Sequence, residues 1–252
     1  MAEFVEHISC ESCGSKDNLA VYSDGGMWCF GCSKYCPPTL GNRIKQKQNQ
    51  LTKPEEVNKV VSLPEDYDPF YFPLEALQWV AQYELTQQDL KRNRVGWSES
   101  QHRLIFPFIV DGHLAAYQGR YFKGEVGEFG ERSEQRKPPK WLSRGKIHEF
   151  LYILKSHSKE LIIVEDPLSA IKLQKYGYSS CPLFGSQVTP TQKKCLLFSG
   201  YQDLTFWLDR DKLSTAYKYS KELNDLGFNC RVVSTDNDPK EVPHEQFESV
   251  LK

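Results

Sequence analysis

The chain has 252 residues, with 32 basic and 33 acidic side chains, and its formal net charge is −1. This length is sufficient for one large domain or two modest ones, and the near-neutral charge means that any nucleic-acid-binding surface must be a local patch. No apolar run of ~18 or more residues occurs, and the N-terminus MAEFVEHISC lacks a basic start followed by an apolar stretch. The sequence therefore predicts a soluble intracellular protein without a membrane span or a secretory signal.

The N-terminal part is rich in cysteine, because five of the eight cysteines lie within residues 10–36. Four of them form two Cys-x-x-Cys pairs that are separated by fifteen residues: Cys10, Cys13, Cys29 and Cys32. Each pair can place two thiolates on one side of a tight turn, and a β-hairpin over residues 19–28 can bring the two turns together. Four such sulfurs are the ligands of a structural Zn²⁺. The alternatives are that Cys36 or His7 replaces one of the four.

A basic segment follows the cysteines. Residues 41–53 hold four basic residues, three glutamines and no acidic residue. A solvated linker is the simplest interpretation, and a basic linker between two nucleic-acid-binding parts also favours a phosphate backbone. We therefore expect a zinc ribbon over residues 1–40 and a flexible basic linker over residues 41–60.

The middle region, residues 61–155, is expected to form an α+β subdomain. Residues 73–83 begin with proline and carry apolar residues at helical spacing, and Thr86 can cap a second short helix. Residues 103–110 and 114–122 are apolar runs on either side of an Asp-Gly pair, which predicts a β-hairpin.

A long polar segment follows this hairpin. Residues 123–140 contain three glycines and many charges, and a segment of this length is either disordered or a substrate-binding flap. Basic side chains around it are candidates for binding the phosphates of a nucleotide: Arg120, Lys140, Arg144 and Lys146.

In the last part of the chain, residues 156–252, short apolar runs alternate with helical patterns. The apolar runs are residues 161–165, 178–184, 204–208 and 230–234, and the helical patterns are residues 167–177, 189–198 and 213–227. Alternation with short connections predicts a parallel four-stranded sheet with helices on its faces, so the fold class is α/β with a small β ribbon at the N-terminus.

Acidic residues gather where these strands end. Glu165 and Asp166 follow the first strand, and four more acids follow the third and fourth: Asp209, Asp211, Asp236 and Asp238. Ligands of open parallel sheets bind beyond the carboxyl ends of the strands. Carboxylates brought together there repel one another, at a cost on the order of several kcal/mol, unless cations neutralise them. Mg²⁺, with Mn²⁺ as an alternative, is the ion that such oxygen ligands suit, and alternation along the strand would turn Arg210 away from it.

The order of these acids resembles a known signature. A glutamate at the first strand end, Asp-x-Asp at a later one and Asp-Pro near the last are similar to the Toprim domain. Together with the four-cysteine ribbon, the basic linker and the hairpin region, the chain resembles the phage DNA primases of the zinc-ribbon plus Toprim type, within the bacterial-type primase superfamily. The resemblance implies a primase that synthesises short RNA primers on single-stranded DNA by metal-dependent nucleotidyl transfer from ribonucleoside triphosphates. We expect it to be a stand-alone primase, because the sequence lacks the phosphate-binding motif of an ATP-driven motor.

The same resemblance assigns roles to individual acids. Glu165 corresponds to the catalytic glutamate, Asp209 and Asp211 to the metal-binding pair, and Asp238 to the later acid of the family. It implies catalytic Mg²⁺, one ion or two, on Glu165, Asp209 and Asp211.

The chain departs from the family pattern directly after the glutamate. The family has glycine where this chain has Asp166, and an acid where this chain has Ser169. Either Asp166 supplies the missing carboxylate, or one metal ion is bound more weakly.

Partners follow from the same resemblance. No G-x-x-x-x-G-K-[ST] loop is present in the sequence, so we expect a separate replicative helicase, a DNA polymerase partner and a location in the cytoplasm of an infected bacterial host. Two other functions stay open: a recombination mediator that binds DNA without catalysis, and a Toprim nuclease.

Overall fold

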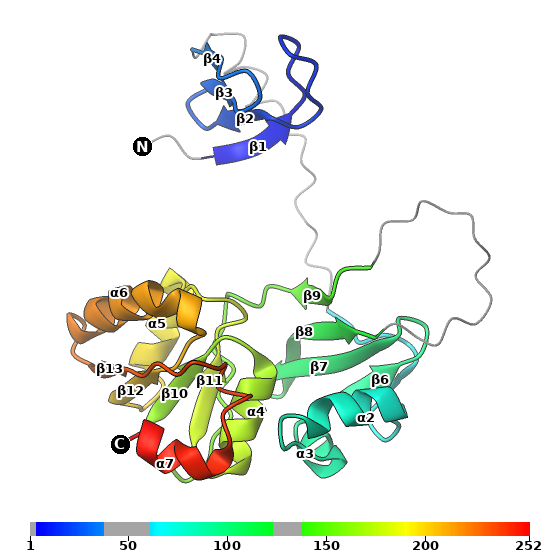
Figure 1. Ribbon diagram of the computed structural model, residues 1–252, viewed down its shortest axis with the longest axis vertical. Helices are drawn as coiled ribbons and strands as arrows, with labels where there is room; N and C mark the ends of the chain where they lie inside the picture. The colour runs from blue at the N-terminus through cyan, green and yellow to red at the C-terminus, as the bar shows by residue number, and fades with distance from the viewer. Residues whose placement is uncertain (1–3, 38–60, 123–137) are drawn as a thin grey trace. The chain divides into compact units, whose positions relative to one another are not determined.

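The computed structural model describes residues 4–37, 61–122 and 138–252 of the chain (Figure 1). The chain divides into two units, Met1–Val60 and Val61–Lys252. The finer boundaries expected from the sequence, at residues 40, 60 and 155, stay predictions. The basic linker and most of the segment 123–140 lie outside the described residues. No helix among those described is long and apolar enough to cross a membrane.

The first unit is a small antiparallel sheet. Its strands follow the order β1-β2-β3-β4 and are β1 (Phe4–Ile8), β2 (Leu19–Tyr22), β3 (Met27–Cys29) and β4 (Tyr35–Cys36). The hairpin predicted over residues 19–28 is confirmed, and its turn contains Gly25 with a φ of 89°, a conformation that glycine adopts without strain. The hydrophobic cluster of this unit is small: it consists of Cys10, Leu19 and Cys29 among the described residues, with Met27 packed against it, and Ala20 and Val21 of β2 are also buried.

The second unit begins with a five-stranded antiparallel sheet and two helices. Its elements are β5 (Tyr67–Asp68), α2 (Leu74–Ala81), α3 (Gln87–Arg92), β6 (Gly96–Ser98), β7 (Arg103–Val110), β8 (His113–Tyr121) and β9 (Trp141–Gly145). The predicted hairpin is β7 and β8. Asp111 and Gly112 at its tip both have positive φ, 50° and 80°, as a tight hairpin turn of this hand requires. Thr86 caps α3 as expected, through a capping box with Asp89.

The rest of the second unit is a parallel sheet covered by helices on both faces (Figure 1). The strands follow the order β11-β10-β12-β13 and are β10 (Leu161–Val164), β11 (Ser179–Pro182), β12 (Asp203–Phe206) and β13 (Asn229–Val232). The helices are α4 (Pro167–Lys175), α5 (Pro190–Leu197), α6 (Leu213–Asn224) and α7 (Phe247–Val250). The predicted parallel four-stranded sheet is confirmed.

The core explains why the central strand β10 is apolar throughout. Leu161 and Ile163 of β10 pack in one buried cluster, while Ile162 and Val164 pack in another on the opposite face. The second cluster also includes residues of β7, such as Phe106 and Phe108, so the antiparallel and parallel sheets share one hydrophobic core. Because both faces are covered, side chains of both alternating sets are buried.

Candidate active site and metal centre

The two Cys-x-x-Cys pairs converge in the first unit. The sulfurs of Cys10 and Cys32 are 3.9 Å apart, those of Cys13 and Cys29 are 3.7 Å apart, and all four lie within 4.8 Å of one another. Zinc–sulfur bonds of about 2.3 Å in a tetrahedron place sulfurs about 3.8 Å apart. The cluster therefore has the geometry of a four-thiolate metal centre. In the described part of the chain, Cys36 does not belong to it, and neither does His7.

Local hydrogen bonds prepare one of these thiols for a metal. The main-chain N–H of Cys32 lowers the pKa of the Cys29 thiol to about 6, and the hydrogen bond with Cys29 raises the pKa of Cys32 to about 12. Without a metal at neutral pH, the Cys29 sulfur therefore carries negative charge and the Cys32 sulfur keeps its proton. Metal binding at neutral pH must displace the remaining protons.

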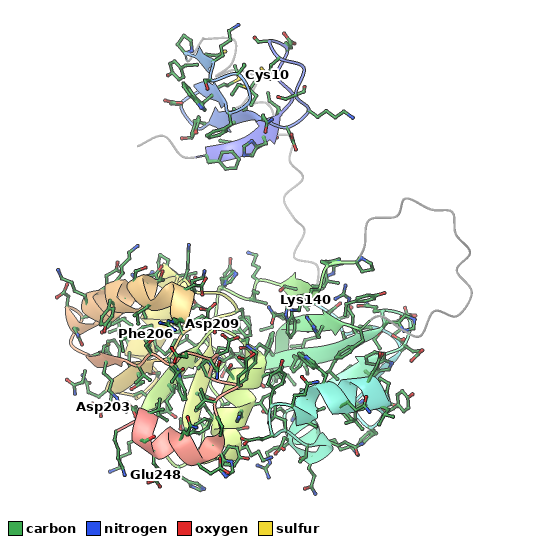
Figure 2. All side chains as sticks on the ribbon, viewed as in Figure 1. Cys10, Lys140, Asp203, Phe206, Asp209 and Glu248 are labelled. Atoms are coloured by element: carbon green, nitrogen blue, oxygen red, sulfur yellow. The ribbon has the colours of Figure 1, made fainter. Side chains whose placement is uncertain are left out.

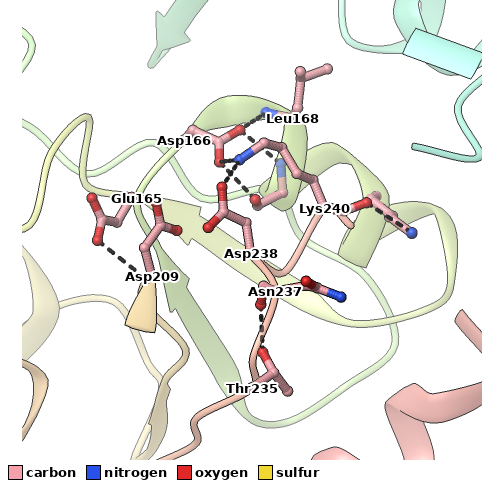
Figure 3. Close-up of polar contacts among 10 residues, drawn as sticks. Glu165, Asp166, Leu168, Asp209, Thr235, Asn237, Asp238 and Lys240 are labelled. Atoms are coloured by element: carbon pink, nitrogen blue, oxygen red, sulfur yellow. Dashed lines mark hydrogen bonds and ion pairs between the residues drawn. The ribbon is translucent and has the colours of Figure 1, made fainter. Parts of the chain in front are cut away.

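In the second unit, the acids meet where the strand order reverses. From β10, the central strand, the chain passes to β11 on one side and later to β12 on the other. Glu165 follows β10 directly, and Asp209 lies just beyond β12. The main-chain N–H of Asp209 donates to Oε1 of Glu165 over 3.2 Å (Figure 3). Ligands of open parallel sheets bind at this kind of reversal point.

The charge on these two acids is poorly compensated. Burial raises the pKa of Glu165. Burial, followed by the negative charges of Glu165 and Asp238, raises the pKa of Asp209 to about 7. Among the residues that the structure describes, Oδ1 of Asp209 is buried and has no hydrogen-bond partner. An acceptor without a donor beside a second carboxylate fits a bound cation.

Lys240 connects two further acids. Its Nζ lies 2.5 Å from Oδ2 of Asp238 and 3.3 Å from Oδ2 of Asp166 (Figure 3). Asp166 is also the N-cap of α4, where its Oδ1 accepts from the main-chain N–H of Leu168 at 2.9 Å and of Ser169 at 3.1 Å. The Asp166 carboxylate, which replaces the glycine of the family pattern, is thus already bonded on both oxygens.

Asp211 lies outside this arrangement. Its side chain is 70% exposed and forms an ion pair with neighbouring Lys212. Arg210 pairs with Asp236 over 2.5 Å at the surface. Alternation along a strand was expected to turn Arg210 away from the two aspartates on either side of it. That reason is wrong, because β12 ends at Phe206 and Arg210 begins the 3₁₀ turn Arg210–Lys212. Among the described residues, the acids of this edge do not form a group of three with ligand atoms within 4.8 Å of one another. Apart from the cysteines, the group that does so lies elsewhere in the unit and consists of Glu84, His244 and Glu245.

A cleft faces the acids, and its other side is formed by the antiparallel sheet together with the end of α2. Figure 2 labels Lys140 on this wall and Asp209 on the acidic wall. The wall of the antiparallel part consists of Trp79, Tyr83, Gln118, Arg120, Lys140 and Trp141, and the opposite wall includes Glu165, Asp166, Asp209, Asp238 and Lys240. Acids and basic or aromatic side chains therefore confront each other across one space.

Arg120 is the best-defined cation of this cleft. Its guanidinium carbon lies 5.0 Å from the ring centre of Trp79 and 5.7 Å from that of Trp141. Within the described chain, its Nε and Nη1 are buried and have no hydrogen-bond acceptor. Stacking on aromatic faces stabilises the cation and leaves its N–H groups available for an anion such as a phosphate.

Comparison with known proteins identifies a sequence relative. No family model matches the sequence. The DNA helicase/primase of Enterobacteria phage T3 is 24% identical over 218 residues, which are 82% of this chain and 35% of that protein. The chain thus spans about a third of the length of the curated relative that it matches.

A solved structure shows the same fold. The zinc-binding and RNA polymerase domains of Aquifex aeolicus primase match 99% of this chain and 77% of their own, with a TM-score of 0.53 and 14% identity. The predicted resemblance to zinc-ribbon and Toprim primases is confirmed. The primase fragment of the bacteriophage T7 primase-helicase also matches, over 98% of both chains, with a TM-score of 0.46 and 15% identity.

Within this primase-like fold, the predicted site residues separate into two groups. The cleft contains Glu165, Asp209, Asp238, Arg120 and Lys140, whereas Asp211, Arg144 and Lys146 do not line it. Arg144 and Lys146 are exposed, and Lys146 pairs with Glu149 over 3.3 Å.

Sequence reasoning missed Trp79, Trp141 and Lys240. Lys240 could have been found from the sequence, because it directly follows the Asp238-Pro239 pair that belongs to the family signature. Nothing in the sequence pairs the two tryptophans, which are far apart along the chain.

Proposed function

We propose that this chain is a DNA primase that synthesises short RNA primers on a single-stranded DNA template from ribonucleoside triphosphates. The observation that carries the proposal is the cleft that opposes Arg120 to the Glu165 and Asp209 pair. The similarity to a phage DNA helicase/primase supports it. A nucleotide needs both walls, because its triphosphate requires cations and its base requires a flat apolar partner.

The acidic wall would hold the catalytic metal. Glu165 and Asp209 fit a divalent ion, because Oδ1 of Asp209 is a buried acceptor without a donor in the described residues. Bound Mg²⁺ would neutralise charge on the attacked phosphate and on the leaving pyrophosphate, and would lower the pKa of the attacking 3′-hydroxyl. Mn²⁺ is an alternative ion. Asp211 stays a predicted ligand, and its carboxylate would first have to leave Lys212.

The opposite wall would position the substrate. The Arg120 guanidinium offers unpaired N–H groups to the triphosphate, and Lys140 lies on the same wall. Trp79 and Trp141, whose ring centres are 6.4 Å apart, lie on this wall, and the ring faces that Arg120 does not cover would stack on a base. In each cycle the 3′-oxygen of the primer forms a bond to the α-phosphorus of the incoming nucleotide, the bond from that phosphorus to pyrophosphate breaks, and the hydroxyl proton passes to water.

The four-cysteine cluster would hold a structural Zn²⁺. The described part of the first unit buries only five apolar residues, and just three of them form its hydrophobic cluster, which is too small to stabilise a domain alone. Metal binding to Cys10, Cys13, Cys29 and Cys32 would supply that stability. We further propose that the ribbon binds the template.

The deciding experiment is primer synthesis. The protein is incubated with single-stranded DNA, Mg²⁺ and labelled ribonucleotides, with and without a replicative helicase. The variant is Asp209→Asn, and the matched control is Asp236→Asn, an exposed acid paired with Arg210 near the same sheet edge. Short labelled RNA from the wild type and the control, but not from the variant, supports the proposal.

Two other results would overturn it. Cleaved template without synthesis would indicate a Toprim nuclease, and DNA binding without chemistry, even with the helicase present, would indicate a mediator. A separate helicase, a polymerase partner and the host cytoplasm remain predictions.

A further inference from the structure

Lys240 is held rigidly among the acids of the cleft. Its ammonium contacts both Asp166 and Asp238, at 3.3 Å and 2.5 Å, and its side chain is only 16% exposed (Figure 3). An ammonium shared by two carboxylates in a partly dry site is a fixed charge, because releasing it would leave both acids uncompensated. Lys240 therefore belongs to the charge balance of the site.

The main chain of Lys240 is fixed as well. Its carbonyl oxygen accepts a hydrogen bond from Nζ of Lys172 over 3.0 Å. The Lys172 side chain is 2% exposed, also donates to the carbonyl of Val242 over 2.7 Å, and pairs with Glu84 over 3.0 Å. A buried ammonium with three acceptors anchors the segment that carries Lys240, so the position of its side chain is built into the fold.

The remaining two acids, Glu165 and Asp209, have no such partner in the part of the chain that the structure describes. Glu165 accepts a hydrogen bond from the main chain of Asp209, and Oδ1 of Asp209 has no donor among the described residues. Asp166 is satisfied by Lys240 and by the first turn of α4. The four carboxylates thus divide into one pair in direct contact with the Lys240 ammonium and one pair that forms no ion pair among the described residues. Lys212 and Lys240 act on this second pair only at longer range.

We propose that the Lys240 ammonium takes the place of a second metal ion, so that the site binds a single divalent cation on Glu165 and Asp209. The inference rests on the proposed metal-dependent function. It also accounts for the departure from the family pattern, since Asp166, in place of glycine, is the acid that holds Lys240, and Ser169 donates its hydroxyl to Asp166 over 2.7 Å.

The test counts bound ions directly. Full-length zinc-loaded protein is titrated with Mn²⁺, and free Mn²⁺ is measured by electron paramagnetic resonance. Lys240→Met removes the ammonium at similar side-chain length, and Lys240→Arg keeps the charge. Asp209→Asn serves as the blank, so that ions bound elsewhere, such as at Glu84, His244 and Glu245, are subtracted.

We expect one Mn²⁺ for the wild type and for Lys240→Arg, and two for Lys240→Met. Two ions on the wild type, or one on a folded Lys240→Met, would overturn the inference. Circular dichroism checks folding, and the wild-type count decides alone if the methionine variant does not fold. Primer synthesis separates the two proposals. Two ions on an active wild type overturn only the single-ion inference, whereas one ion on a wild type that makes no RNA overturns only the primase function.

Discussion

The main-chain N–H of Asp209 donates to Oε1 of Glu165 across the gap between two neighbouring parallel strands. The two residues are 44 positions apart in the chain, and the topology of the sheet alone brings them together. Their carboxylates share one edge, where burial raises both pKa values. Such an arrangement costs stability unless a ligand compensates it, which is typical of a functional site.

Asp209→Asn should stabilise the protein when no divalent ion occupies the cleft. The pKa of Asp209 is raised to about 7, so ionisation of this carboxylate opposes folding above its unfolded pKa of about 4, and the cost grows until the pH passes about 7. We expect a gain on the order of 1 kcal/mol at pH 8, because the open cleft screens the charges, and a smaller gain at pH 5.5. Urea unfolding of zinc-loaded protein in Mg²⁺-free buffer measures both. A loss of stability at pH 8 would contradict the assignment.

Mg²⁺ should stabilise the wild type and not Asp209→Asn. A ligand that binds only the folded state raises the free energy of unfolding, by about 2.7 kcal/mol at 100 times its dissociation constant. The measurement is the thermal midpoint as a function of Mg²⁺ concentration. Asp236→Asn is the control, because Asp236 is exposed and pairs with Arg210, and it should respond like the wild type. If Mg²⁺ raised the thermal midpoint of all three proteins equally, the ion would not bind at Asp209.

Arg120→Gln should impair nucleotide use, whereas Arg144→Gln should not. Arg120 lines the cleft with unpaired N–H groups, and Arg144 is exposed on the neighbouring strand β9 and lies outside it. Loss of a charged hydrogen bond to phosphate removes about 1.5–3 kcal/mol of transition-state stabilisation, roughly a 10- to 160-fold fall in kcat/KM. Steady-state primer synthesis at varied ribonucleotide concentration measures it. A similar fall in both variants would argue against a special role of Arg120.

The parallel sheet was predictable because short, largely apolar segments such as β10 alternate with amphipathic helices that begin at caps and end at glycines. The hairpin of β7 and β8 was equally clear, because Asp111-Gly112 separates two long apolar runs. Strands β5 and β6 were missed because they have only two and three residues, which is too short for a periodic signal, and β9 was missed because it follows a long charged segment.

The acids of the site were predictable only as far as the strand ends. Glu165, Asp209 and Asp238 reach the cleft because parallel strands share a carboxyl edge. Asp211 was expected there too, but the 3₁₀ turn after β12 directs it to Lys212. The bonds of Lys240 to Asp166 depend on tertiary folding, across 74 positions of sequence, and no local pattern contains them.

Cys29→Ser should abolish zinc binding and unfold the first unit. Cys29 is completely buried and belongs both to the sulfur cluster and to the small core beside Leu19. Cys36→Ser is the matched control, because Cys36 lies on β4 outside the cluster, and it should keep one zinc per chain. Elemental analysis gives the zinc content, and limited proteolysis reports which unit unfolds. If Cys36→Ser also lost its zinc, the four-ligand assignment would fail.

Lys172→Met should destabilise the second unit strongly. Lys172 is buried, pairs with Glu84 and donates to the carbonyl groups of Lys240 and Val242. Its removal leaves a carboxylate and two carbonyl oxygens without their donor, which costs about 3 kcal/mol. Chemical unfolding, followed by tryptophan fluorescence, measures the loss.

Lys194→Met provides the comparison, since Lys194 is exposed on α5, and its effect should stay within about 0.5 kcal/mol. Lys172 also fixes the segment that carries Lys240. We therefore expect the primer synthesis of the Lys172 variant to fall further than the fraction of folded protein falls. Activity that follows the folded fraction alone would show that this lysine stabilises the fold without positioning the site.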